Sequence, residues 1–130
     1  MTRTLQPETW PRPSGYSNGI IADGSVIVLA GQIGWDAITG RIAEGMPAQV
    51  EQALRNIVAV LVEANAGPSD IVRLTWFVTD MEQYRREAKA IGQGYRRVIG
   101  KHFPAMSVIG VSCLVEPDAV VEIEATAVVK

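Results

Sequence analysis

The stretch VEIEATAVV, residues 121–129, alternates apolar side chains with mostly polar ones, and this pattern decides the class of fold. A period of two residues is typical of a β-strand with two unlike faces. Val121, Ile123 and Ala125 would lie on a face covered by the rest of the protein. Glu122 and Glu124 would point to the opposite side. The chain is therefore expected to end in a strand over residues 119–129, in a sheet that buries one of its faces.

Other strands are predicted earlier in the chain. Residues 71–79 are rich in β-branched and aromatic side chains, and residues 107–114 form a second apolar run. Near the N-terminus, Ile20–Ile21 and residues 26–30 flank the sequence ADGS. Because Asp-Gly favours the tight turns of hairpins, we predict that these two segments pair as a β-hairpin. A further short strand is expected at Arg41–Ile42.

Two helices are predicted between the strands. From Val50 to Val62, apolar residues recur at steps of three and four, which indicates an amphipathic helix with one buried stripe. Gly45 and Pro47 suit its beginning. A second helix is expected from about Met81 to Gly100, although glycines within it weaken its interior.

Together these elements predict an α+β domain over residues 1–130, with a mixed sheet of about six strands and two helices on one face. Residues 1–13 contain three prolines and are expected as an extended lead-in. Two helices can cover only one face of such a sheet, yet Phe77 and either Ile109 or Val108 place apolar side chains on the other. We therefore expect an oligomer whose subunits bury their bare sheet faces against one another.

Composition excludes several classes of function. Twelve basic and fourteen acidic residues give a net charge of −2, which disfavours nucleic acid as a partner. One cysteine and one histidine rule out a cysteine-cluster or multi-histidine metal site. No apolar run is long enough for a membrane helix, and the N-terminus does not look like a secretory signal, so a cytoplasmic protein without membrane contact is expected.

Six short segments carry a further indication. They are GYSNG (15–19), LAGQI (29–33), ALRNI (53–57), DIVRLTWFVTDM (70–81), FPA (103–105) and VEIEATA (121–127). In this order they resemble the Rid family of reactive-intermediate deaminases, also known as the YjgF/UK114 or L-PSP family. The resemblance covers the chain from about Ser14 to Val129.

The resemblance implies a homotrimer of chorismate-mutase-like subunits, with the sheets inside, the helices outside and a site at each subunit interface. It also implies hydrolysis of 2-imino or 2-enamino acids to 2-oxo acids and ammonia, with no cofactor and no metal. In the family, an arginine directly after Pro-Ala binds the substrate carboxylate. A glutamate on the last strand positions or activates water, and Glu122 matches that glutamate.

The sequence departs from the family pattern after Pro104-Ala105, where Met106 replaces the arginine. A guanidinium offers a fixed fork of donors to a carboxylate, whereas a thioether offers neither charge nor donor. Met106 would either line a wall of the pocket or fill the space that the arginine leaves. The departure predicts altered substrate specificity.

The other candidate residues each have two interpretations. Glu122 is the catalytic candidate, or else a carboxylate paired across the interface. Tyr16 could contact a ligand or only anchor the first strand, and the turn Gly31-Gln32-Ile33 could offer backbone N–H groups or serve as a turn alone. Arg73 could replace the missing cation or pair with a glutamate of a neighbouring subunit.

Two classes of function stay open at this point. One is a cofactor-independent, deaminase-like hydrolase acting on an imine, enamine or related small metabolite. The other is a non-enzymatic trimer that binds a small ligand or acts as a regulatory or chaperone-like module.

Overall fold

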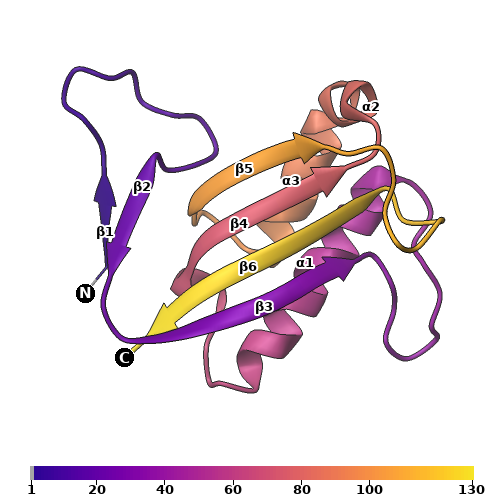
Figure 1. The fold of residues 1–130 in the computed structure, drawn as a ribbon, viewed down its shortest axis with the longest axis horizontal. Helices are drawn as coiled ribbons and strands as arrows, with labels where there is room; N and C mark the ends of the chain where they lie inside the picture. Colours follow the sequence, from indigo (N-terminus) through magenta and orange to yellow (C-terminus); the bar gives the residue numbers. More distant parts are fainter. Residues whose placement is uncertain (1) are drawn as a thin grey trace.

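The computed structural model describes residues 2–130, and the strand at 121–129 lies in the interior of its main sheet (Figure 1). Across this sheet the order is β3 (Ser25–Ile33), β6 (Val121–Val129), β4 (Ile71–Val78) and β5 (Ala105–Gly110). β6 runs antiparallel to both of its neighbours, while β4 and β5 are parallel. Parallel neighbours need a long crossover connection, which the helices between β4 and β5 supply. The predicted α+β class and mixed sheet are confirmed.

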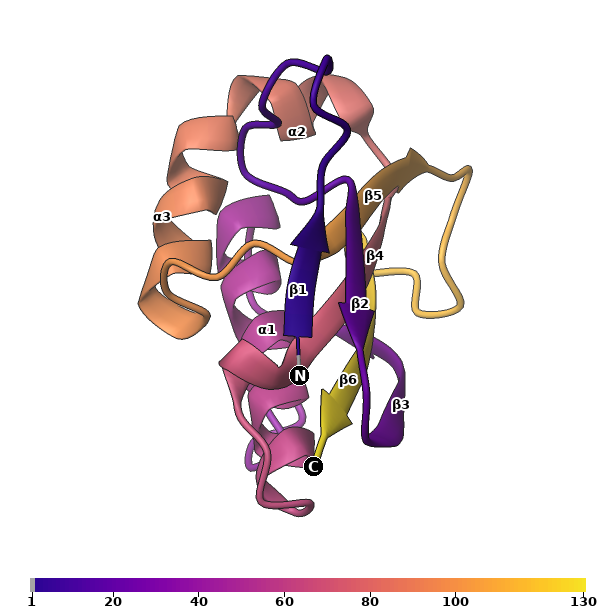
Figure 2. The ribbon, with the colours of Figure 1, turned by 90° about the vertical axis from the view of Figure 1, so that its left-hand side faces the viewer.

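The helices lie together on one face of this sheet (Figure 2). They are α1 (Met46–Val62), α2 (Met81–Arg86) and α3 (Ala88–Val98), and a short 3₁₀ turn, η1 (Pro68–Asp70), precedes β4. The predicted apolar stripe of α1 is buried, including Val50, Leu54 and Ile57. It packs against inward side chains of the sheet such as Ile123, so the alternation read from the last strand does mark the covered face.

The opposite face of the sheet has no helix over it. Val26 is 63% exposed, Val28 is 79% exposed and Ile109 is 44% exposed in the single chain. These apolar side chains share the face with Glu122. Val28 lies opposite Thr126, which is four residues from Glu122 on β6, so the two side chains point to the same side of the sheet. The bare, partly apolar face that the sequence predicted is therefore present.

The predicted N-terminal hairpin is wrong. β2 (Gly19–Ala22) pairs with β1 (Thr2–Leu5), in a segment expected only as an extended lead-in, whereas β3 pairs with β6. The turn itself exists, and Gly24 adopts a positive φ of 138°. A Cβ at Gly24 would lie 2.1 Å from the Val129 carbonyl oxygen, so the end of β6 occupies the place beside β3. A turn sequence predicts a change of direction, but the strand that becomes the neighbour is chosen by long-range packing.

The remaining differences concern the ends of elements. The six strands within residues 2–130 divide into a four-stranded and a two-stranded sheet. The helix expected from Met81 to Gly100 breaks at Glu87 into α2 and α3. β5 ends at Gly110, earlier than predicted, and the strand expected at Arg41–Ile42 is only an isolated bridge between Trp35 and Ile42.

Candidate functional site

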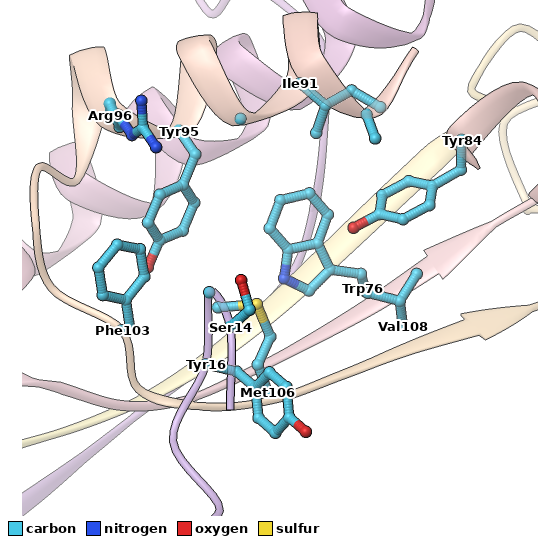
Figure 3. A pocket seen from close by; sticks show the side chains of 13 residues that line it. Ser14, Tyr16, Trp76, Tyr84, Ile91, Tyr95, Arg96, Phe103, Met106 and Val108 are labelled. Carbon is cyan, nitrogen blue, oxygen red and sulfur yellow. The ribbon is translucent and has the colours of Figure 1, made fainter. Parts of the chain in front are cut away.

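A cavity of about 420 Å³ lies between the helical layer and the β4–β5 half of the sheet (Figure 3). The strand register explains why it forms there. Met106 lies opposite Leu74 and Val108 lies opposite Trp76, so both β5 side chains point to the helix face. α3 supplies the facing wall through Ile91 and its neighbours. The cavity volume falls within the usual range for small-molecule sites.

A row of aromatic rings forms one part of the cavity wall. Tyr84 meets Trp76 edge to face at 6.3 Å between ring centroids, and Tyr95 stacks on Trp76 at the same distance. Phe103 continues the row, 6.0 Å from Tyr95. The Tyr95 hydroxyl donates a hydrogen bond of 2.5 Å to the carbonyl oxygen of His102, which anchors the ring. The wall therefore offers flat apolar surfaces in fixed positions.

Neither Tyr84 nor Tyr95 can act as a base near neutral pH. Burial raises the pKa of the Tyr84 hydroxyl and, more strongly, that of Tyr95, because the charged phenolate loses its hydration. Both hydroxyls stay protonated and serve only as hydrogen-bonding groups.

Trp76 and Arg96 each bring to the cavity a nitrogen group without a protein partner among residues 2–130. The indole Nε1 of Trp76 is buried, and no acceptor within residues 2–130 bonds to it. Arg96, on the exposed side of α3, also lines the cavity, and its guanidinium forms no ion pair or hydrogen bond with the residues that the structure describes. Its neighbour Arg97 instead pairs with Glu51 at 2.7 Å.

The mouth of the cavity is bordered by the loop that contains Ser14 and Tyr16. Ser17 attaches this loop to the start of β5: its Oγ donates to the Phe103 carbonyl oxygen at 2.5 Å, and its N–H donates to that of Pro104 at 3.0 Å. The loop is thereby held beside β5, and Tyr16 is placed at the entrance.

Glu122 lies on the other side of the sheet. It is opposite Phe77 of β4 and Ile33 of β3, on the face that has no helix. Its carboxylate occupies the space that a side chain at Gly31 would take, since a Cβ there would lie 2.4 Å from Oε2. Within residues 2–130 the Glu122 carboxylate has no hydrogen-bond or ion-pair partner.

The structure thus divides the predicted site residues into two groups. Tyr16 and Met106 meet at the cavity, and Met106 forms part of its wall without filling it. Gly31, Ile33 and Glu122 lie together on the bare face.

Two predicted residues belong to neither group. The Gln32 amide turns back onto the Ala30 carbonyl oxygen at 3.3 Å. Arg73 is exposed, lies opposite Thr126 and is not among the residues that line the cavity.

Sequence reasoning missed the aromatic wall and Arg96. Trp76 lies on the helix face of β4, opposite Val108, and is only 2% exposed. Arg96 and Arg97 are both exposed on α3, but Arg97 pairs with Glu51 and only Arg96 borders the cavity. A helical wheel of α3 alone cannot distinguish the two, because the cavity exists only once α3 packs beside β5.

Neither a cluster of metal ligands nor a membrane-spanning helix occurs within residues 2–130. No group of three or more histidine, cysteine, aspartate or glutamate side chains lies close enough to hold a metal ion. No helix in this range is long and apolar enough to span a membrane.

Comparisons with a family model and with known proteins agree on one family. Residues 9–129 match the family model described as Endoribonuclease L-PSP. The chain is 35% identical to the 2-iminobutanoate/2-iminopropanoate deaminase of Salmonella typhimurium, over 98% of each chain. It is 36% identical to the RutC family protein UK114 of Drosophila melanogaster, over 86% of this chain and 78% of that one.

Solved structures show the same fold. The Rid-family protein YyfB of Yersinia pestis superposes with a TM-score of 0.85 at 35% identity, covering 98% of both chains. The YjgF gene product of E. coli superposes with a TM-score of 0.72 at 32% identity, covering 98% of this chain and 99% of that one.

Proposed function

Because this chain belongs to the Rid family, we propose that it is a cofactor-independent hydrolase that acts on an imine, enamine or related small metabolite. The observation that carries the proposal is the cavity lined by Met106, the residue that stands where the family pattern has its carboxylate-binding arginine. The deaminases among its relatives are named for 2-iminobutanoate and 2-iminopropanoate. The present chain differs from the family pattern at Met106, so its substrate is proposed to differ as well.

The active unit is proposed to be a homotrimer with a site at each interface. Cavity and Glu122 lie on opposite faces of one sheet, so a single chain cannot bring both to one ligand. A neighbouring subunit whose bare face packs near the β5 edge could supply its own Glu122. The exposed apolar side chains of that face support this packing, since exposed apolar surface is favoured at interfaces between subunits.

The proposed chemistry is addition of water to a carbon–nitrogen double bond. The Glu122 carboxylate accepts a proton as the water oxygen bonds to the imine carbon. The proton then passes to the nitrogen to give a carbinolamine. The proton of its hydroxyl group passes to the nitrogen in turn as the carbon–nitrogen bond breaks, so ammonia leaves and a carbonyl compound remains. A carboxylate without a competing ion-pair partner is suited to this transfer, and such acid–base assistance contributes about 10²–10⁴ in rate. Tyr16 and backbone N–H groups near Gly31 are proposed to position the ligand.

Met106 is the basis for the altered specificity. Replacing the family's arginine with a thioether removes a charge-assisted hydrogen bond, which is worth about 1.5–3 kcal/mol, or about ten- to a hundredfold in binding. A small 2-imino acid would lose its main anchor. Arg73, considered from the sequence as a substitute, lies away from the cavity in the same chain.

The decisive experiment measures ammonia release from imines generated in situ by an amino-acid oxidase. Glu122→Gln should abolish turnover without changing the oligomer, because the amide keeps the shape of the side chain and cannot accept the proton. Glu124→Gln is the matched control, since Glu124 lies on the same strand and face but opposite Thr75, and it should retain activity. Full turnover by Glu122→Gln would show that Glu122 is structural.

Met106→Arg tests the specificity in the same assay. Activity on small 2-imino acids is expected to rise by at least tenfold, since the variant restores the fork of donors. If only the variant releases ammonia, the natural protein is not an ordinary imino-acid deaminase.

A second candidate is a non-enzymatic small-ligand-binding trimer, favoured by the largely apolar wall of the cavity. Saturable ligand binding without ammonia release from any imine would support it. A nuclease, which the family description names, would require salt-sensitive RNA binding, and absence of binding at low salt would remove it. The cytoplasm is the proposed compartment for either candidate.

A further inference from the structure

Trp76 carries a hydrogen-bond donor that the protein leaves unused. Its side chain is 2% exposed, and its Nε1 is the one buried side-chain nitrogen or oxygen within residues 2–130 that lacks a partner. Buried N–H groups are nearly always paired, so an orphan beside a cavity indicates an absent acceptor. In Figure 3 this nitrogen lies on the side of the ring that faces Tyr95 and Met106, toward the cavity.

Arg96 provides the second polar group. Its guanidinium is unpaired within the described part of the chain and borders the same cavity, whereas the adjacent Arg97 is held by Glu51. A guanidinium at the rim of an apolar cavity is suited to a carboxylate, which it can bind through two parallel hydrogen bonds. Arg96 thus offers a positive charge at the cavity, in place of the family's arginine, whose position is taken by Met106.

The space between these two groups determines the size and the polarity of the ligand that fits. A volume of about 420 Å³ exceeds what a small 2-imino acid would fill. The rings of Tyr84, Trp76 and Tyr95 line it at centroid spacings of 6.3 Å and present flat apolar surfaces. A bulky apolar side chain of the ligand would displace water from this wall, and burial of its apolar surface would favour binding.

From these observations we propose that the cavity binds a carboxylic acid with an aromatic or large aliphatic side chain, namely a 2-oxo acid or its 2-imino precursor. Arg96 binds the carboxylate at the rim. An acceptor atom of the ligand takes the hydrogen bond of the Trp76 indole, and the apolar side chain lies among the rings. The identification of the imine as substrate rests on the proposed function, whereas the binding mode can be tested by itself.

Met106 acts as a movable cover in this site. The Trp76 nitrogen has almost no contact with solvent, so a ligand atom reaches it only when a neighbouring side chain shifts. Met106 lines the cavity and is only partly buried, and a methionine has three rotatable bonds and adapts readily to irregular surroundings. Its replacement of the family's arginine therefore removes one anchor and leaves an uncharged side chain that can move away from the other.

The test uses the full chain labelled with nitrogen-15 and follows its indole N–H signals by NMR. Three tryptophans give three signals, and the one lost in Trp76→Phe belongs to Trp76. Phenylpyruvate is expected to move that signal in a saturable way. Pyruvate, which lacks the ring, and phenylacetone, which lacks the carboxylate, should bind at least tenfold more weakly. No movement of the Trp76 signal with phenylpyruvate would overturn the proposal.

Arg96→Gln and Arg97→Gln form the matched pair of variants. Each removes one exposed cation from the same turn of α3, so neither should disturb the fold. Arg96→Gln is expected to weaken phenylpyruvate binding by about 10- to 100-fold, and Arg97→Gln should leave it unchanged. Equal affinity in the wild type and Arg96→Gln would overturn the role of Arg96, as would equal weakening by both variants.

Binding and turnover together separate this proposal from the proposed function. Phenylpyruvate binding through Arg96 and Trp76 without ammonia release from any imine supports the site and contradicts the hydrolase. Ammonia release from the imine of phenylalanine that is unaffected by Arg96→Gln supports the hydrolase and contradicts the site.

Discussion

Gly31 and Gly34 lie three residues apart and are glycines for different reasons. A Cβ at Gly31 would meet the end of a flexible side chain, the carboxylate of Glu122, at 2.4 Å. A Cβ at Gly34 would meet the backbone of Gln49, whose Cα lies 2.5 Å away. A side chain can swing aside at little cost, whereas a helix backbone cannot. One glycine therefore positions a candidate catalytic group, and the other lets β3 and α1 approach.

Gly31→Ala is expected to leave the protein folded and to reduce turnover by at least tenfold, because the new methyl group displaces the Glu122 carboxylate. Ammonia release and thermal unfolding measured on the same sample check both halves of this prediction. Gly34→Ala is the contrasting variant and should lose about 2–4 kcal/mol of unfolding free energy through overpacking and backbone shift. Unchanged turnover in Gly31→Ala would mean that the position of Glu122 does not matter.

Gln49 shows why the Gly34 contact is sensitive. This buried amide donates to the carbonyl oxygens of Ala43 and Asp118, both at 3.0 Å, and accepts from the N–H of Val120 at 2.8 Å. It therefore connects α1 to the segments before the helix and before β6. Moving the backbone at Gln49 would leave several buried polar groups unpaired, which is costly.

At the scale of elements, α1 and α3 are joined by an ion pair on the outer surface. Glu51 of α1 accepts hydrogen bonds from Arg97 of α3 and from Arg55, each at 2.7 Å at its closest. The hydrogen bond from Arg97, followed by that from Arg55, lowers the pKa of the Glu51 carboxyl below its usual value of 4.5. The interaction steadies the helix that forms one wall of the cavity.

This pair makes a small part of the stability dependent on pH. A carboxyl whose pKa is lower in the folded state stabilises the fold above its unfolded pKa, and the contribution is lost as the pH falls through the folded value. Arg97→Gln should thus be slightly less stable than the wild type at neutral pH. The difference should shrink below pH 4.5. Urea unfolding of both proteins at neutral and acidic pH measures this, and a difference that grows on acidification would contradict it.

At the scale of the whole molecule, the bare sheet face is the feature that a single chain leaves unexplained. Val28 is 79% exposed on this face. If the proposed trimer buries it, Val28→Asp would place a charge in an apolar interface and should convert the trimer to monomers. Light scattering reports the mass directly. Val62→Asp is the control, since Val62 is 57% exposed at the end of α1 in the helical layer, and it should remain trimeric.

Complementation between inactive variants tests whether each site is shared by two subunits. Gly92→Phe should block the cavity, because Gly92 lines it and a side chain there would enter open space. Glu122→Gln removes the acid. When the two chains are co-expressed in equal amounts, about a quarter of the interfaces combine an intact cavity with an intact Glu122, so about a quarter of the wild-type activity should return. No recovery would contradict a site that combines the cavity of one subunit with Glu122 of another.

The control for the blocked cavity is Gln93→Phe, which adds the same ring to the adjacent, exposed position of α3. It should retain activity in the homotrimer. Loss of activity in that variant would show that the ring perturbs α3 itself and not the cavity.

The sequence by itself determined the family, the α+β class and which side chains share a face of each strand and helix. Val121 and Ile123 are buried as the alternation predicted, and α1 buries the stripe read from its period. These properties are local, since a period of two or of 3.6 residues is set by the geometry of a single element.

Only the tertiary structure decided what those faces meet. It paired β2 with β1 instead of β3, placed Met106 and Glu122 on opposite sides of one sheet, and put Arg96, not Arg73, beside the cavity. Each of these results depends on which distant segment packs alongside. That choice is made by the free energy of the whole core, which no short stretch of sequence contains.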